Sequence, residues 1–172
     1  MNISTVGTDN TIVGEKAKVK TSRFGEIEID TDRIVSMTSP FPGFPESSRF
    51  ILLPNKPDSP FMWLQSLEDS DLAFVIVQAA FLEIDYAPPV PTGVQEELHI
   101  KTEKDQEILL ILTIPQGKPQ EMTANLLGPV IINTKKRLAR QIVLDPNQYD
   151  LCWPVFNKKT HEEGIAEQKK PA

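Results

Sequence analysis

Short apolar runs, rich in β-branched and aromatic residues, constrain the fold of this chain more than any other feature. In residues 24–30 the apolar Ile27 and Ile29 alternate with acidic neighbours, as expected of a half-buried strand whose successive side chains point to opposite faces. Each run is bounded by Pro, Gly, Asn or Asp, and this spacing predicts an all-β sandwich or barrel. The other predicted strands cover residues 50–53, 62–65, 72–77, 107–114, 123–127, 130–133 and 140–144.

The segments between these runs predict turns and very little helix. Residues 133–137 have the composition of a hairpin turn joining the last two strands, and residues 66–71 can form at most one tight turn. Three prolines make residues 40–45 irregular, because Pro lacks a backbone N–H and fixes φ. Only residues 92–99 favour a helix, of about two turns, with Thr92 as the expected N-cap and two acids placed early against the helix dipole.

The chain of 172 residues has the length of one ordinary domain. Residues 1–18 are polar and lack a sustained period, so we expect an N-terminal arm without stable structure there. Residues 157–172 are equally poor in apolar side chains and are expected to form a mobile tail. These boundaries predict a single folded domain over residues 19–156.

Cysteine content and hydropathy bear on the cellular compartment. Cys152 is the only cysteine, so the chain cannot form an internal disulfide, and its apolar neighbours Leu151 and Trp153 predict a buried thiol. The N-terminus lacks the basic and apolar regions of a signal peptide, and the apolar run at residues 72–80 is too short to span a bilayer. We therefore expect a cytoplasmic protein that is not embedded in a membrane.

Charge is distributed very unevenly along the chain. Residues 57–100 contain no Lys or Arg, so ion pairs within this block cannot neutralise its acidic side chains. The negative field of the block favours a basic partner. The alternative is a solvated acidic surface that keeps the protein soluble. The net charge of −6 argues against direct nucleic-acid binding, and a solvated hairpin tip explains the basic cluster at residues 135–137 as well as a phosphate site does. The acids of the block are Asp58, Glu68, Asp69, Asp71, Glu83, Asp85, Glu96 and Glu97.

The sequence contains few groups that could support catalysis. There are two histidines, too few for a zinc site with the one cysteine, and no glycine-rich phosphate loop or nucleophile-elbow motif occurs. Glu68, Asp69 and Asp71 are close enough to chelate Ca²⁺ or Mg²⁺, but acids at such positions also serve as turn residues that bond their own backbone. We expect a binding protein that is not an enzyme and needs no metal or cofactor.

Aromatic side chains beside the acids are candidates for an interface. Phe41 and Phe44 lie in the proline-rich loop, and Trp63 precedes the acidic turn. Large apolar groups with a charged surround are typical of an interface core and its rim. The alternative is that such aromatics close the ends of a barrel, which we expect for at least Trp63 and Phe74.

Residues 60–74, Pro-Phe-Met-Trp-Leu-Gln-Ser-Leu-Glu-Asp-Ser-Asp-Leu-Ala-Phe, resemble the corresponding segment of the bacterial flagellar assembly factor family FliW. Further segments match the family in the same order, so the resemblance extends over residues 19–149. A collinear series of segments is more specific than any single motif. The further matching segments are residues 23–29, 42–44, 49–54, 113–115, 122–133 and 141–144.

The resemblance implies a mostly β protein: a small antiparallel β-barrel-like single domain with one or two short helices and no catalytic activity. Proteins of this family bind the RNA-binding translational repressor CsrA, away from its RNA surface, and relieve its repression of flagellin mRNA. They also bind flagellin, which competes for them. The segments before residue 19 and after residue 156 are longer than is usual in the family.

Together, the residues and the resemblance give a testable hypothesis. Acids of the turn (Glu68, Asp69, Asp71) and of residues 83–97, including Glu83 and Asp85, face the basic repressor. Apolar surface near Phe41, Phe44 and Trp63 takes part in flagellin binding. The free protein is expected to be a monomer. The alternatives are a secretion chaperone that binds flagellin only and an acidic metal protein or enzyme built on Glu68, Asp69 and Asp71.

Overall fold

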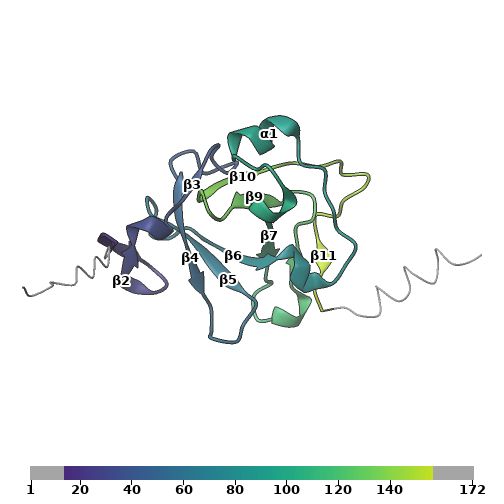
Figure 1. Cartoon of the computed structure of the whole chain (residues 1–172). Helices are drawn as coiled ribbons and strands as arrows, with labels where there is room; N and C mark the ends of the chain where they lie inside the picture. Colours follow the sequence, from purple (N-terminus) through teal and green to yellow (C-terminus); the bar gives the residue numbers. More distant parts are fainter. Residues whose placement is uncertain (1–13, 157–172) are drawn as a thin grey trace, which may run out of the picture.

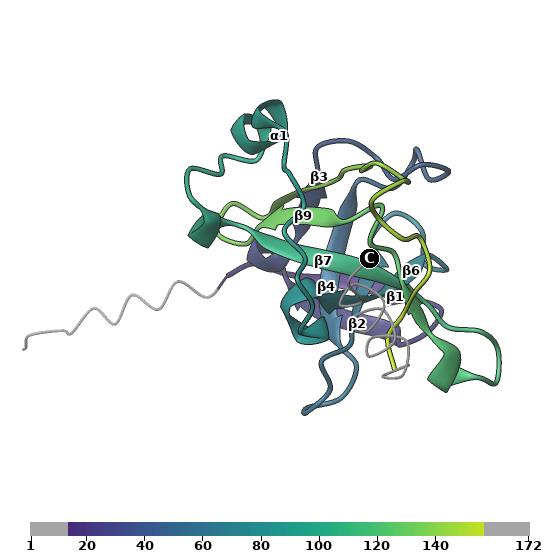
Figure 2. The same ribbon diagram turned by 90° about the vertical axis from the view of Figure 1, so that its right-hand side faces the viewer.

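The computed structural model describes residues 14–156, and its centre is a barrel of seven strands (Figure 1). The strand order is β7-β6-β5-β4-β3-β10-β9, and pairing of β9 with β7 closes the ring (Figure 2). All neighbours are antiparallel except β3 and β10, which run parallel. The strands are β3 (Val35–Met37), β4 (Arg49–Pro54), β5 (Met62–Ser66), β6 (Ala73–Gln78), β7 (Glu107–Thr113), β9 (Val130–Asn133) and β10 (Leu138–Gln141).

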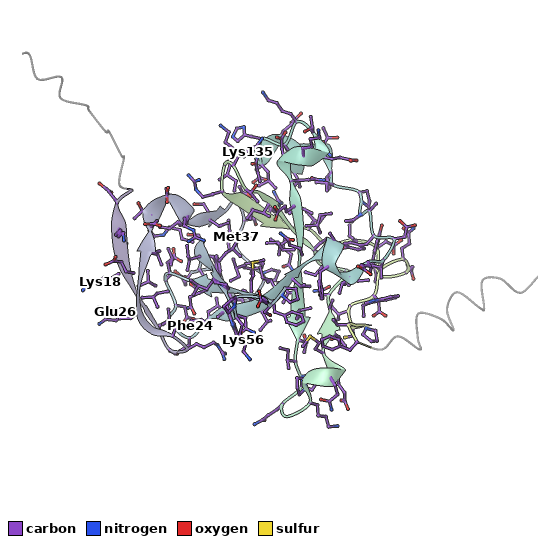
Figure 3. The ribbon with its side chains drawn as sticks, turned by 60° about the horizontal axis from the view of Figure 1, so that its bottom comes forward. Lys18, Phe24, Glu26, Met37, Lys56 and Lys135 are labelled. Carbon is purple, nitrogen blue, oxygen red and sulfur yellow. The ribbon has the colours of Figure 1, made fainter. Side chains whose placement is uncertain are left out.

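Alternate side chains of these strands fill the barrel. Phe50, Leu64 and Ile76 on β4, β5 and β6 are fully or almost fully buried and belong to one cluster with Leu109 of β7. Figure 3 labels Met37, whose side chain lies among these residues in the middle of the molecule. The barrel core therefore uses one face of each strand, and the opposite faces are available for a second layer of packing.

Three outer layers cover those opposite faces. The hairpin of β1 (Lys16–Thr21) and β2 (Gly25–Asp30) packs Val19 and Ile29 against Ile51 of β4. Its other face carries the ion pairs Lys16–Glu28 and Lys18–Glu26, and Figure 3 shows Lys18 and Glu26 on this outer hairpin.

The second and third layers lie over the other strands. Helix α1 (Thr92–Glu97) covers β9 and β10 (Figures 1 and 2) by burying Val94 and Leu98 against Ile131. Strands β8 (Thr123–Ala124) and β11 (Trp153–Pro154) extend the sheet beyond β7. Four 3₁₀ helices complete the described part of the chain: η1 (Thr31–Arg33), η2 (Ala79–Leu82), η3 (Glu103–Asp105) and η4 (Pro119–Glu121).

The predicted mostly β barrel is confirmed, and so is the hairpin turn between β9 and β10. Three strands were not predicted, because β3 and β11 have only three and two residues and the period of β1 is masked by lysines. Since β1 starts at Lys16, the predicted arm is structured over its last residues. The rest of that arm, residues 1–13, and the predicted tail, residues 157–172, lie outside the described part of the chain.

Three local predictions were wrong. The N-cap position of α1 is Pro91 rather than Thr92, and Glu96 and Glu97 lie at the end of this short helix rather than in its first turn. Cys152 is exposed rather than buried. Its backbone N–H donates to Oδ1 of Asp150, so the residue belongs to a short turn before β11. None of the helices within residues 14–156 has the length and apolar character needed to cross a membrane.

Candidate partner-binding surfaces

The proline-rich loop after β3 brings two phenylalanines to one end of the barrel, and only one of them is accessible. A turn at Gly43, which has φ of +86°, places the backbone N–H of Phe44 3.0 Å from the carbonyl oxygen of Phe41. Phe41 is 3 % exposed and its ring centroid lies 4.8 Å from that of Phe74 and 5.4 Å from that of Phe50. Phe41 and Phe74 therefore close the barrel end, as predicted for Phe74. Phe44 is 38 % exposed and rests edge-on against Phe74 at 5.7 Å.

Phe44 forms one wall of a hollow that we call the end groove. The groove has a volume of about 340 Å³. Its rim includes Val143 and Leu151, which are 76 % and 56 % exposed and are among the most exposed large apolar side chains of residues 14–156. Its lining residues are Phe41, Pro42, Phe44, Phe74, Ile111, Asn125, Leu127, Gly128, Gln141, Val143 and Leu151. Accessible apolar side chains gathered around a hollow are typical of a protein-binding site.

Two side-chain amides among the lining residues meet at Gly128. The backbone N–H of Gly128 donates to Oδ1 of Asn125 at 2.8 Å, and its carbonyl oxygen accepts from Nε2 of Gln141 at 2.9 Å. Within the described chain, Nδ2 of Asn125 and Oε1 of Gln141 have no hydrogen-bond partner. The end groove therefore combines apolar walls with one donor and one acceptor.

Sequence reasoning did not identify Val143, Leu151 or the two amides. Val143 belongs to a run predicted to be strand, and although β10 ends at Gln141, the N–H groups of Ile142 and Leu144 still donate to backbone carbonyl oxygens. Ile142 is buried, and Val143 is exposed. Leu151 follows a turn that starts at Asp145. An apolar residue in a turn-forming segment was the one signal that could have pointed to Leu151.

Trp63 lies away from the end groove. Its neighbours on β5 face the barrel interior, so its own side chain points outward. There the Trp63 ring lies 5.9 Å from that of Phe24, and the guanidinium of Arg23 lies 4.1 Å from its centroid. The expectation that Trp63 closes the barrel end was therefore wrong, and the structure does not bring Trp63 together with Phe41 and Phe44.

The acidic turn, residues 66–71, connects β5 to β6 and uses its polar side chains to bond its own backbone. Oγ of Ser66 accepts the N–H groups of Glu68 and Asp69, and Nε2 of the buried Gln65 donates to the carbonyl oxygens of Ser66 and Leu72. Oδ1 of Asp69 accepts the N–H of Asp71 at 2.9 Å, which confirms its role as a turn acid.

Asp71 reaches across to a second element. Its carboxylate accepts a hydrogen bond from the hydroxyl of Ser22 at the tip of the β1–β2 hairpin. Asp71 therefore ties that hairpin to the acidic turn, and it does so without a cationic partner within the described chain.

Two acids of the basic-free block are neutralised by arginines from outside it. Glu68 accepts from Nε of Arg49 at 2.9 Å and from the backbone N–H of Arg49 at 3.1 Å. Partial burial acts to raise the pKa of Glu68, but the hydrogen bonds from Arg49 outweigh it and lower this pKa below its usual range. The 2.5 Å contact with Nη1 of Arg140 likewise lowers the pKa of Glu97. The field of the block is thus weaker than the sequence suggested.

The remaining acids form two separate groups. Asp69 and Asp71 lie at the start of β6, whereas Glu83 and Asp85 follow its other end, with Glu83 in the left-handed backbone region after η2. Six residues at about 3.3 Å each make β6 about 20 Å long, so the two groups occupy opposite ends of the strand. The described residues contain no ion pair for any of these four exposed acids.

A metal site at the acidic turn is not supported by its geometry. Glu68 is directed to Arg49, and Asp69 to the backbone of its own turn. No group of three or more His, Cys, Asp or Glu side chains within residues 14–156 is arranged to hold a metal ion. The surfaces suited to binding are therefore the end groove and the two groups of unpaired acids.

Comparison with known proteins gives one consistent result. The family model described as FliW protein matches residues 18–155. The flagellar assembly factor FliW of Alkaliphilus metalliredigens is 38 % identical over 156 residues, which are 90 % of this chain and 95 % of that protein. That of Natranaerobius thermophilus is 36 % identical over 140 residues, 81 % of this chain and 93 % of the relative. A crystal structure of the flagellar assembly factor FliW superimposes with a TM-score of 0.75 at 33 % identity, covering 83 % of this chain and 99 % of the other.

Proposed function

The chain belongs to the FliW family of flagellar assembly factors, and from this premise we propose that it acts by binding two proteins, a CsrA-type RNA-binding repressor and flagellin. Binding of the repressor away from its RNA surface releases flagellin mRNA for translation in the cytoplasm. Binding of flagellin withdraws the factor from the repressor. The level of unassembled flagellin then controls its own synthesis without any catalytic step.

The end groove is the observation that carries this proposal. A hollow of about 340 Å³ lined by Phe44, Val143 and Leu151 leaves apolar surface in contact with water. Covering such surface is favourable by about 25 cal/mol for each Å² removed from water, so a partner with exposed apolar side chains gains free energy there. Flagellin that has not yet assembled is a partner of this kind, and we assign it to the end groove.

The acidic turn supports the repressor part of the proposal. Asp69 and Asp71 carry exposed carboxylates without an ion pair in the described chain. Exposed charge of one sign raises the rate at which an oppositely charged protein associates, and an RNA-binding repressor is basic. Glu83 and Asp85, at the far end of β6, are the second candidate surface for the same partner.

A three-way pull-down tests the function. The purified chain is immobilised and offered the purified repressor, purified flagellin, or both, from the same bacterium. We expect each protein to bind alone and increasing flagellin to displace the repressor. Binding of flagellin without any binding of the repressor would instead identify a secretion chaperone dedicated to flagellin.

A further inference from the structure

We infer that the end groove selects one kind of segment: an apolar stretch of a partner chain that is flanked by Lys or Arg and hydrogen-bonded through the backbone of one residue to Asn125 and Gln141. This inference rests on the proposed function to the extent that a protein partner occupies the groove. It goes further by naming the chemistry that the partner segment must have.

The apolar part of the segment follows from the walls. Phe44, Val143 and Leu151 border the opening, and Phe74 and Ile111 lie beneath it. Their exposed surface is made of aromatic and aliphatic carbon, which a charged or polar side chain would cover at a cost in its own hydration. The volume of about 340 Å³ accommodates a few side chains and not a folded domain. The occupant is therefore a short apolar stretch.

The basic flanks follow from the charges around the groove. The residues that line the groove lie in stretches of the sequence that contain no Lys or Arg. These stretches are residues 41–48, 57–100, 105–117, 119–134 and 141–156. Within two residues of Phe44, Val143 and Leu151 in the sequence, these stretches carry the exposed acids Glu46, Asp145 and Asp150. The adjoining arginines, Arg49 and Arg140, are already paired with acids at 2.9 and 2.5 Å. A segment with cationic flanks is attracted to this surround, and one with acidic flanks is repelled.

The hydrogen bonds from the partner's backbone to the two side-chain amides follow from the geometry at Gly128. A Cβ added to Gly128 would lie 2.9 Å from Nε2 of Gln141 and 3.0 Å from Nδ2 of Asn125, so both amides border the same small space. Nδ2 of Asn125 is a donor and Oε1 of Gln141 an acceptor, and neither has a partner within the described chain. One residue of an extended partner chain offers the matching carbonyl oxygen and N–H on the same side of its backbone.

Selection from a library of short random peptides displayed on phage tests the inference without assuming any natural partner. The purified full chain is the target of the selection. A counter-selection against the Val143→Ser/Leu151→Ser double variant removes peptides that bind outside the end groove. Both positions are exposed and the substitution leaves charge unchanged, so the double variant is expected to fold normally. We expect the enriched peptides to share apolar positions flanked by Lys or Arg, to be depleted in Asp and Glu, and to bind more weakly as salt is raised.

A pair of glycine variants tests the amide contact with those selected peptides. Gly128→Ala is compatible with the backbone, because φ at this position is not in the left-handed region, and its new methyl group displaces the two amides. We expect about a tenfold loss of peptide affinity, the size of one interface contact. The control Gly93→Ala lies in α1, has no atom within 4 Å of the new Cβ, and should bind as the wild type does.

The possible results separate this inference from the proposed function. Any one of three results would overturn the inference. The enriched peptides could have acidic flanks, they could bind the double variant as tightly as the wild type, or they could bind Gly128→Ala with unchanged affinity. Flagellin and the repressor could still bind in the pull-down, in which case the proposed function stands with another contact surface. Conversely, apolar peptides with basic flanks could bind the groove although flagellin does not bind the protein. The inference would then hold, and flagellin would be excluded as the natural occupant of the groove.

Discussion

Phe44 and Phe24 are exposed to nearly the same extent, 38 % and 37 %, but only Phe44 borders the end groove. We predict that Phe44→Ala lowers flagellin affinity about tenfold, because the variant removes one wall of the contact surface. Isothermal titration calorimetry measures the affinity, and thermal unfolding confirms that the variant is folded. Phe24→Ala is the matched control, since Phe24 packs on Trp63 instead. Equal losses in the two variants would contradict the assignment of flagellin to the groove.

Glu68 is a residue whose charge stabilises the fold. Its pKa in the folded protein lies below the ordinary value of 4.5, so its contribution is complete above that value and is lost as pH falls through the folded-state pKa. We predict that Glu68→Gln lowers the free energy of unfolding at neutral pH by about 0.5–1 kcal/mol and reduces the loss of stability on acidification. Urea unfolding at several pH values measures both effects. Glu83→Gln, which removes an exposed acid without an ion pair in the described chain, should change neither.

The roles of single aromatic residues were the least predictable from sequence. Neighbouring positions of β5, such as Trp63 and Leu64, are both apolar, because one faces the barrel and the other an outer layer. With apolar residues on both faces, alternation no longer shows which side is inside. The sequence therefore could not tell that Phe41 is buried, that Phe44 is accessible, or that Trp63 points away from both.

At the scale of elements, β6 separates two groups of acids that one sequence block had joined. We predict that neutralising the acidic turn with Asp69→Asn/Asp71→Asn slows association with the repressor and flattens its salt dependence. Asn retains the side-chain oxygen that accepts the N–H of Asp71, so the turn should remain intact. Stopped-flow association at low and high salt measures the effect.

The matched variant Glu83→Gln/Asp85→Asn removes the same charge at the other end of β6. If the acidic turn steers the repressor, this variant associates at the wild-type rate. The reverse outcome, with a slower rate for the second variant only, would move the repressor surface to the segment after β6.

Strands of five to seven residues, such as β5 and β7, were predicted because a run of that length shows its pattern and its bounding turns. β3 and β11 were missed because two or three residues cannot show a period. β1 was missed for another reason. Its lysines face solvent and pair with the acids of β2, so its two-residue period depends on the small side chain of Ala17 and on Val19.

At the scale of the whole molecule, closure of the barrel by β7 and β9 leaves no long unpaired edge in that ring. Unpaired edges are the usual route to strand-to-strand association, so we predict a monomer of 19.3 kDa in the absence of partners. Light scattering after size-exclusion chromatography measures the mass. A mass of twice this value that persists on dilution would contradict the prediction and indicate self-association through another surface.

The fold class and the family could be predicted from sequence, because both depend on local patterns and on the order of short segments, which can be recognised without knowledge of contacts. Which residues form the candidate binding surfaces became clear from the three-dimensional arrangement alone. The end groove draws on loops and strands from Phe41 to Leu151, and the charges of Glu68 and Glu97 are offset by Arg49 and Arg140 from outside their block. Contacts between residues so distant in sequence are set by strand order and closure of the barrel, which no local pattern encodes.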